Sequence, residues 1–400
     1  MKLAAFCFVM ILPVALVSGA LVPAQQSKPP ANSFSVTPHV EQPVSSNGYV
    51  RLKMVRIMDQ TGLSEPTEVL RMFIPADWKF EGRAKWLPEN VSCPENITAV
   101  TFRASSPDDR FALERFPETF WMWVSNAPAD AIQRRTSCPL REPVSAEDYF
   151  TEEILPEARP GSRILSTLQL HEFSTAQKEQ LERAHPAPLN FGNDVTTSAD
   201  SVRINYEYLD LGQTIHEFMV GTIFSMRSRS DLWPFFNKGP KYADFYWIHA
   251  SDIYATRAPQ EDSQSGAVLA RILASLRGNP RWSAGRDDVM ERVMRSRPTA
   301  GEPLPVGKSD QATEKQIAES YRLQAQSQLT RARLYDGAAR PMELFVEPVT
   351  KASAELNGGF AFAWCNNKDE YILTNDANFN PEEKFKESWT QLQRAASPQP

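Results

Sequence analysis

The residue types best suited to catalysis do not fall into the spacings that catalytic and metal sites require. The triplet His-Glu-Phe occurs at 171–173 and at 216–218, but a helical zinc site needs a second His four residues after the first, and Thr175 and Val220 stand there. The patterns GxSxG, GxGxxG and GxxxxGK[ST] do not occur. We interpret both triplets as strand residues, and we expect His249 to be buried and hydrogen-bonded. We predict no catalytic residue, no metal site and no cofactor.

A basic and aromatic stretch at 226–247 is the best candidate for a binding site. The residues that we expect to bind a ligand there are Arg227, Arg229, Trp233 and Lys238. Aromatic rings beside cations suit an anionic glycan, a lipid headgroup or an envelope protein. A connecting loop whose aromatic side chains fold back over a sheet is the alternative interpretation, and both stay open.

The N-terminal residues have the pattern of a secretory signal. Lys2 supplies a positive charge, residues 3–22 carry none, and small residues follow at a spacing suited to cleavage. We expect a signal peptide over 1–24 with cleavage after Ala24, or alternatively after Ala20. An uncleaved membrane anchor is the other interpretation. We expect an exported, periplasmic or extracellular protein whose mature chain has no transmembrane span, because no later segment is long and apolar enough.

Export changes how the cysteines are interpreted. Cys93 and Cys138 each precede a proline, which places both in loops, and an oxidising compartment favours their pairing as a disulfide. Cys365 lies in an aromatic stretch and is expected to be a buried free thiol. Asn90 and Asn96 begin two N-glycosylation sequons beside Cys93, for which we favour chance occurrence in a bacterial protein, although the sequence does not decide this.

The composition excludes several classes of protein. The 400 residues are 42% hydrophobic and 23% charged, which is typical of a globular protein and not of a disordered chain, a coiled coil or a collagen-like fibre. The net charge of −6 argues against nucleic acid as a partner, because phosphate neutralisation needs a basic surface.

Hydrophobic spacing predicts strands in the first half of the chain and more helix later. Residues 25–48 are rich in Pro, Ser, Gln and Asn and are predicted to be a disordered tether. Alternation at 50–54 and 202–208 is typical of half-buried strands. Residues 215–225 are apolar on both faces and should be central in a sheet. Helical spacing follows at 268–276 and 289–294.

The segment 73–82 resembles the opening of PsbP/DcrB-like modules, in which a strand runs into a Pro, a Trp and a return strand. The order of the elements that follow is similar as far as residue 297. The resemblance implies an α/β sandwich that is exported from the cytoplasm and acts mainly as an accessory or binding protein. We expect this α+β domain over 49–297, a linker over 298–309, and a long helix, a β-hairpin and a closing helix over 310–396.

The sequence therefore predicts an α+β protein, an antiparallel-sheet sandwich with C-terminal helical additions, that binds a partner and does not catalyse a reaction. The specific ligand or partner is not predicted. The alternative function is an envelope hydrolase whose site is assembled from residues far apart in the sequence.

Overall fold

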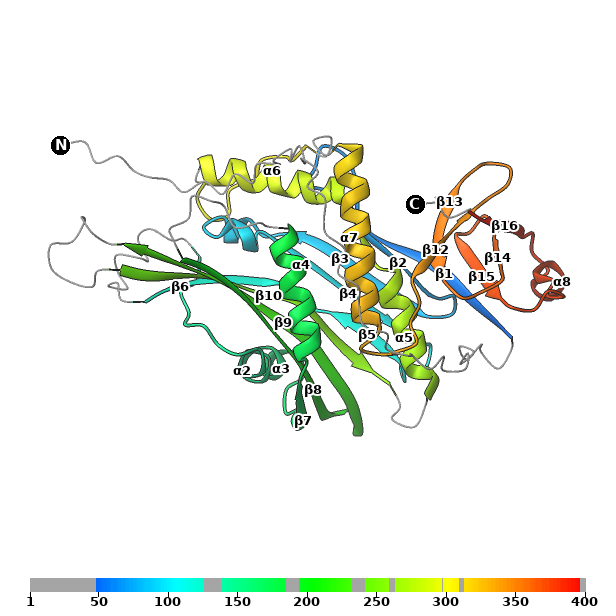
Figure 1. The fold of residues 1–400 in the computed structure, drawn as a ribbon, viewed down its shortest axis with the longest axis horizontal. Coiled ribbons are helices and arrows are strands. Elements are labelled where there is room, and N and C mark those ends of the chain that lie inside the picture. Colours follow the sequence, from blue (N-terminus) through cyan, green and yellow to red (C-terminus); the bar gives the residue numbers. More distant parts are fainter. Residues whose placement is uncertain are drawn as a thin grey trace, which may run out of the picture.

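The chain folds into a mixture of helices and two antiparallel sheets of eight strands each, which confirms the predicted α+β class (Figure 1). The structure is a computed structural model that describes residues 48–125, 138–184, 194–231, 242–258, 263–296, 298–308 and 313–395. The predicted signal peptide and almost all of the predicted tether lie outside these ranges. Among the described residues, no helix is both long and apolar enough to cross a lipid bilayer.

The sheet with the longer strands, which we call the larger sheet, is built around a long β-hairpin. Its strands are β3 (Lys79–Trp86), β4 (Thr98–Ser105), β5 (Ala112–Arg115), β6 (Thr119–Val124), β7 (Arg163–Gln169), β8 (Asp194–Asp210), β9 (Gln213–Asp231) and β10 (Tyr242–Arg257). The spatial order is β3-β4-β5-β10-β9-β8-β7, and β6 also pairs with β10. The strand β9 lies between β8 and β10, so the apolar segment predicted to be central is central.

The second sheet joins the two ends of the chain. Its strands are β1 (Tyr49–Asp59), β2 (Thr67–Pro75), β11 (Arg277–Gly278), β12 (Met342–Val346), β13 (Ser353–Asn357), β14 (Phe362–Cys365), β15 (Glu370–Thr374) and β16 (Thr390–Arg394). The strand β1 pairs with β15 from Tyr49 opposite Thr374 to Lys53 opposite Glu370. The predicted division after residue 297 therefore does not separate the sheets.

Helices pack against the sheets, and Figure 1 shows the short α8 beside β14 to β16 of the second sheet, away from the other helices. The helices are α2 (Ala146–Tyr149), the π-helical turn η3 (Phe150–Ile154), α3 (Leu155–Ala158), α4 (His171–Ala184), α5 (Ser263–Ser275), α6 (Pro280–Ser296), α7 (Glu314–Ala332) and α8 (Pro381–Phe385), with the 3₁₀ turns η1 (Pro88–Asn90) and η2 (Pro94–Asn96). The Ser145 side chain accepts from the backbone N–H of Asp148 and caps α2, as its position before two acids suggests.

Two apolar clusters explain this arrangement. Val202, Ile204 and Tyr206 of β8 point to one face, where Phe150 and Leu155 of the short helices cover them. A second cluster packs α5 against β2 and β4. Residues 219–223 of β9 are buried on both faces, whereas the hairpin end at Leu209 and Leu211 is exposed.

Two predictions about the chain after residue 163 are wrong. The His-Glu-Phe triplet at 171–173 begins helix α4 and is not in a strand. In the segment predicted as a linker, the described residues 298–308 form no helix or strand, and Gly307 makes a single β-bridge with Leu63. The predicted closing helix is the short α8 followed by strand β16, and two hairpins precede it where one was expected.

Candidate functional site

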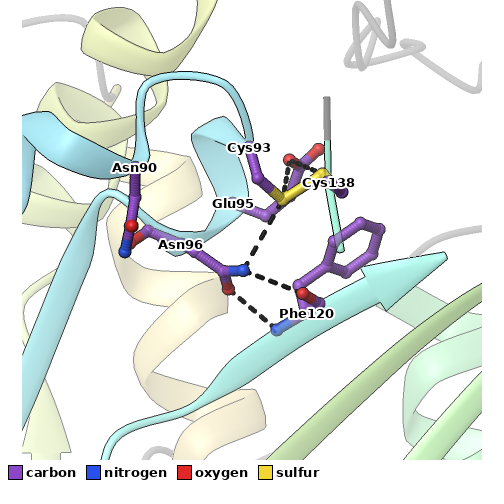
Figure 2. The surroundings of a disulfide bond; sticks show 6 residues. All are labelled: Asn90, Cys93, Glu95, Asn96, Phe120 and Cys138. Carbon is purple, nitrogen blue, oxygen red and sulfur yellow. Dashed lines mark hydrogen bonds between the residues drawn. A yellow bond between two sulfur atoms is a disulfide. The ribbon is translucent and has the colours of Figure 1, made fainter. Parts of the chain in front are cut away.

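The predicted disulfide is present between Cys93 and Cys138 (Figure 2). Cys93 lies between η1 and η2, the two short turns that connect β3 to β4, and Cys138 precedes the loop that leads to α2. Glu95 Oε2 lies 3.7 Å from the sulfur of Cys93 and 3.6 Å from that of Cys138. These three residues together resemble a metal-ligand set, but both sulfur atoms are engaged in the S–S bond.

The side chain of Asn96 hydrogen-bonds the disulfide loop to the backbone of β6. Its Nδ2 donates to the carbonyl of Phe120 at 2.8 Å, and its Oδ1 accepts from the backbone N–H of Phe120 at 2.8 Å. Nδ2 also contacts the sulfur of Cys93 at 3.6 Å. A glycan on Asn96 would replace one of the two N–H groups that make these contacts.

We expect Asn96→Ala to destabilise the protein by about 1–3 kcal/mol, because both backbone groups of Phe120 that it satisfies would lose their partner. Urea unfolding followed by tryptophan fluorescence measures this loss. Asn90→Ala is the matched control, since Asn90 donates a single bond, to the carbonyl of Asn96 at 3.0 Å. Equal losses from the two variants would contradict the role assigned to Asn96.

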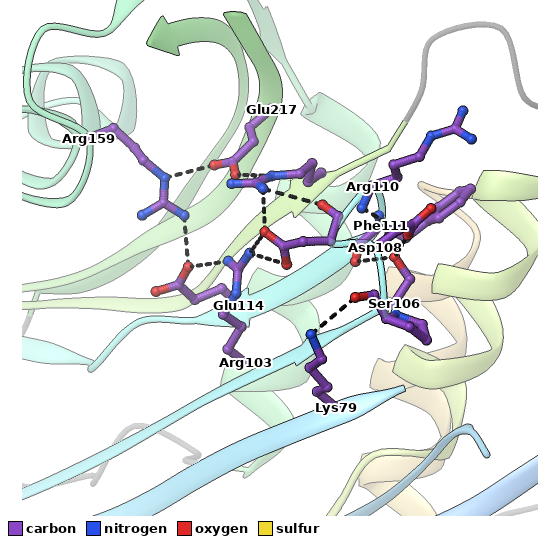
Figure 3. A network of polar contacts seen from close by, with 12 residues as sticks. Lys79, Arg103, Ser106, Asp108, Arg110, Phe111, Glu114, Arg159 and Glu217 are labelled. Carbon is purple, nitrogen blue, oxygen red and sulfur yellow. Dashed lines mark hydrogen bonds and ion pairs between the residues drawn. The ribbon is translucent and has the colours of Figure 1, made fainter. Parts of the chain in front are cut away.

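Six charged side chains form a closed ring of ion pairs in the larger sheet (Figure 3). This ion-pair ring consists of Arg103, Asp109, Glu114, Arg159, Glu217 and Arg257. Glu217 of β9 is its buried member, with a side chain that is 1% exposed. Its carboxylate accepts from Nε of Arg159 at 2.8 Å and from Nε of Arg257 at 3.0 Å. The hydroxyls of Tyr206 and Tyr208 also donate to it.

The other two acids close the ring. Asp109, in the turn before β5, bonds Arg257 at 2.5 Å and Arg103 at 2.8 Å. Glu114 bonds Arg103 at 3.2 Å and Arg159 at 2.7 Å. Each guanidinium thus contacts two carboxylates, and the ring is neutral as a whole. We interpret the ion-pair ring as a set of contacts that holds the β4–β5 hairpin against the long β8–β9 hairpin.

The ring also controls the ionisation of its buried carboxyl. Burial disfavours the charged form of Glu217, but the guanidinium groups of Arg159 and Arg257 and the hydroxyl of Tyr208 outweigh it and hold its pKa below the ordinary value. The same burial, with Glu217 adjacent, raises the pKa of Tyr206. Glu217 is therefore a structural anion at neutral pH.

The predicted ligand-binding residues are only partly described. Trp233 and Lys238 lie outside the described residues. Arg229 forms two bonds to the carboxylate of Asp244, at 2.9 and 3.1 Å, and stacks on the ring of Tyr242. Arg227 lies 3.4 Å from Asp244. Both arginines are thus engaged within the sheet, and their role in ligand binding stays a prediction.

His249 is more exposed than predicted. Its side chain is 41% exposed, and Nε2 lies 3.4 Å from Glu118. Glu118 also pairs with Arg115 at 2.6 Å. Burial opposes ionisation of Glu118, but His249 and Arg115 hold its pKa far below the ordinary value. His249 lies on β10 opposite Phe120 of β6, and its imidazole points to Glu118 at the surface instead of into an apolar cluster.

Cys365 is free, as predicted, but half-buried and not fully buried. Burial raises the pKa of its thiol, which lowers its reactivity as a nucleophile.

No protein-family model, curated protein or solved structure matches this chain. Its function must therefore be argued from its own surface and chemistry.

An exposed row of aliphatic side chains is the surface feature that the sequence analysis missed. It lies on β7, at the end of β8 and in the turn between β8 and β9, and we call it the aliphatic edge: Ile164, Leu165, Leu168, Leu209 and Leu211. Their exposed fractions range from 41% at Leu165 to 100% at Leu211. The two segments are separated in sequence, and the pairing of β7 with β8, from Arg163 opposite Glu207 to Gln169 opposite Val202, brings them to the same edge of the sheet.

Proposed function

We propose that the chain is an exported binding or accessory protein of the periplasm or cell envelope that does not catalyse a reaction. The observation that carries this proposal is the aliphatic edge. Clustered exposed aliphatic side chains mark contact surfaces on globular proteins, whereas scattered ones need no explanation. Here they lie along one edge of the larger sheet, where β7 is the terminal strand and β8 is its neighbour.

The position of β7 strengthens the argument. It is the terminal strand in the order of the larger sheet, and Arg163 to Leu168 are all exposed. Proteins usually protect an edge strand with charge, proline or a covering element, because its unpaired backbone can join another chain. Residues 164–168 contain no charge and no proline. Such an edge favours addition of an extended segment of a partner.

The disulfide supports the exported location. Disulfides persist in oxidising compartments and are rare in the cytosol. The signal-like residues 1–24 provide a route to such a compartment. The PsbP/DcrB-like resemblance of residues 49–297 is part of the same proposal, since the relatives it implies are exported accessory proteins.

Export predicts a processed, oxidised protein. When the full chain is expressed in a Gram-negative host, we expect it in the periplasmic fraction, with Gln25 or Leu21 as its first residue and Cys93 joined to Cys138. Edman sequencing and non-reducing peptide mapping measure both. Leu12→Arg, which interrupts the apolar run, should keep the chain in the cytosol with residues 1–24 attached. Unprocessed wild-type protein in the cytosol with reduced thiols would overturn the proposal.

The enzymatic alternative has its own test. Hydrolysis of a chromogenic ester or glycoside by the purified protein, abolished by His249→Ala, would favour the hydrolase and count against a purely binding role.

A further inference from the structure

The turn that joins β8 to β9 contains a residue whose type does not suit its backbone. Asp210 pairs with Gln213, which leaves Leu211 and Gly212 as a two-residue turn. Both have positive φ, 47° at Leu211 and 81° at Gly212. Such turns favour Asn, Asp or Gly at the first central position, because a larger side chain is strained in the left-handed region.

Leu211 is also fully exposed, at 100%, and Leu209 beside it is 75% exposed. Neither side chain contributes to the core. A leucine at position 211 therefore lowers the stability of the folded protein in two ways. It strains the backbone, and it exposes an apolar side chain to water. Departures of this kind from local preference concentrate at functional sites.

We propose that Leu209 and Leu211 form an anchor that inserts into an apolar pocket of a protein partner, with a Lys or Arg at the pocket rim that pairs with Asp210. This inference rests on the proposed binding function and names the part of the aliphatic edge that contributes most to affinity. Buried side chains at the centre of an interface dominate its binding energy, and the surrounding contacts exclude water.

The negative charge of the turn distinguishes between three possible partners of the anchor: a lipid bilayer, a second copy of the chain and a different protein. Asp210 is exposed and lies between the two leucines. Anionic lipid headgroups would repel its carboxylate, so insertion into a bilayer is disfavoured. A symmetric contact between the turns of two copies would place two Asp210 carboxylates together. A basic rim on a different protein is complementary to this charge.

Leu168 of β7 lies on the same face of the sheet as Leu209, because Leu168 pairs with Arg203 and side chains alternate along β8. Ile164 pairs with Tyr206 and therefore lies on the other face. A partner that covers Leu209 and Leu211 can extend along this face of β8 toward Leu168 and the edge of β7. This gives the anchor the surrounding contact surface that a specific interface needs.

Site-specific cross-linking in the native host locates the partner. A photo-reactive benzoylphenylalanine replaces Leu211, Leu168 or Val349 in the full-length chain. Val349 is the matched control, because it is 83% exposed on the other sheet's β12–β13 loop. We expect one discrete protein adduct from position 211 and none from position 349. An adduct with lipid, or a dimer of the chain itself, would overturn the inference.

Binding of the identified, purified protein then tests the anchor quantitatively. Leu211→Asn should weaken its affinity about tenfold or more, while the midpoint of thermal unfolding stays equal or rises because Asn suits the turn. Asp210→Lys should weaken binding, and reversal of a basic rim residue on the partner should restore it. Unchanged affinity of Leu211→Asn would overturn the inference.

The cross-linking results distinguish failure of the anchor from failure of the binding function. Adducts from position 168 without any from position 211 would reject the anchor and leave the binding function standing. No adduct from either position would reject both.

Discussion

Glu217→Gln is expected to destabilise the protein by about 3–5 kcal/mol, which is the usual loss when one partner of a buried ion pair is removed. The change keeps the size of the side chain but removes the anion that faces Arg159 and Arg257. Each of these arginine side chains is about one-tenth exposed, at 11% and 10%. Both cations would keep their burial and lose their shared buried counter-charge.

Denaturant unfolding measures this loss, and Glu207→Gln is its control. Glu207 lies on β8 of the same hairpin and pairs with Arg163, whose side chain is 71% exposed. Exposed ion pairs contribute about 0–1 kcal/mol, so the control should stay close to wild type. Similar losses from the two variants would show that the ion-pair ring does not hold the hairpins together.

The Glu217→Gln variant should also differ from wild type in how its stability depends on pH. The pKa of Glu217 is lower in the folded protein than in the unfolded chain, so the unfolded state binds more protons between the two values. The stabilisation by Glu217 is fully present above the ordinary carboxyl pKa and is lost as pH falls through the folded value. Wild type and Glu217→Gln should therefore converge in stability at acidic pH. A constant difference across that range would contradict the linkage.

The long hairpin was predictable because its information is local. Alternation of apolar and polar residues fixes which side of a strand is buried, and Val202, Ile204 and Tyr206 follow it and are all buried. The turn at 210–213 separates this strand from a run that is apolar on both faces. Both signals lie within a few residues, so the pairing of β8 with β9 follows from them.

The ion-pair ring was not predictable, and the repeated triplet shows why. At 171–173 the sequence His-Glu-Phe begins α4, where Glu172 is exposed. At 216–218 the same three residues lie in β9, where Glu217 is buried in the ring. Identical local sequence thus has different outcomes, because the partners of Glu217 come through tertiary contacts from the residue that follows α3 and from β10.

The C-terminal error has a similar origin. The spacing of Phe385, Trp389 and Leu392 is compatible with one face of a helix. The structure ends α8 at Phe385, with Lys386 in the left-handed conformation at φ 57°. The chain then enters β16, whose residues pair with β14. An available sheet edge outweighed a weak helical pattern.

Removal of the disulfide by Cys93→Ala together with Cys138→Ala is expected to destabilise the protein by about 4 kcal/mol. The bond closes a loop over a sequence separation of 45 residues, and its loss releases the unfolded chain from that constraint. Unfolding of the variant is compared with that of oxidised wild type and of wild type reduced by a phosphine. Cys365→Ser, which alters the half-buried free thiol, is the control for loss of a sulfur atom.

The reduced wild type separates two causes of that loss. Cys93 is 3% exposed, so its replacement by Ala also removes packed atoms and the contact from Asn96. If loop closure dominates, reduced wild type and the double variant should lose nearly the same stability. If packing around Cys93 dominates, reduced wild type should remain close to the oxidised protein. The second result would mean that the disulfide constrains the chain little, and it would weaken the argument that this protein matures in an oxidising compartment.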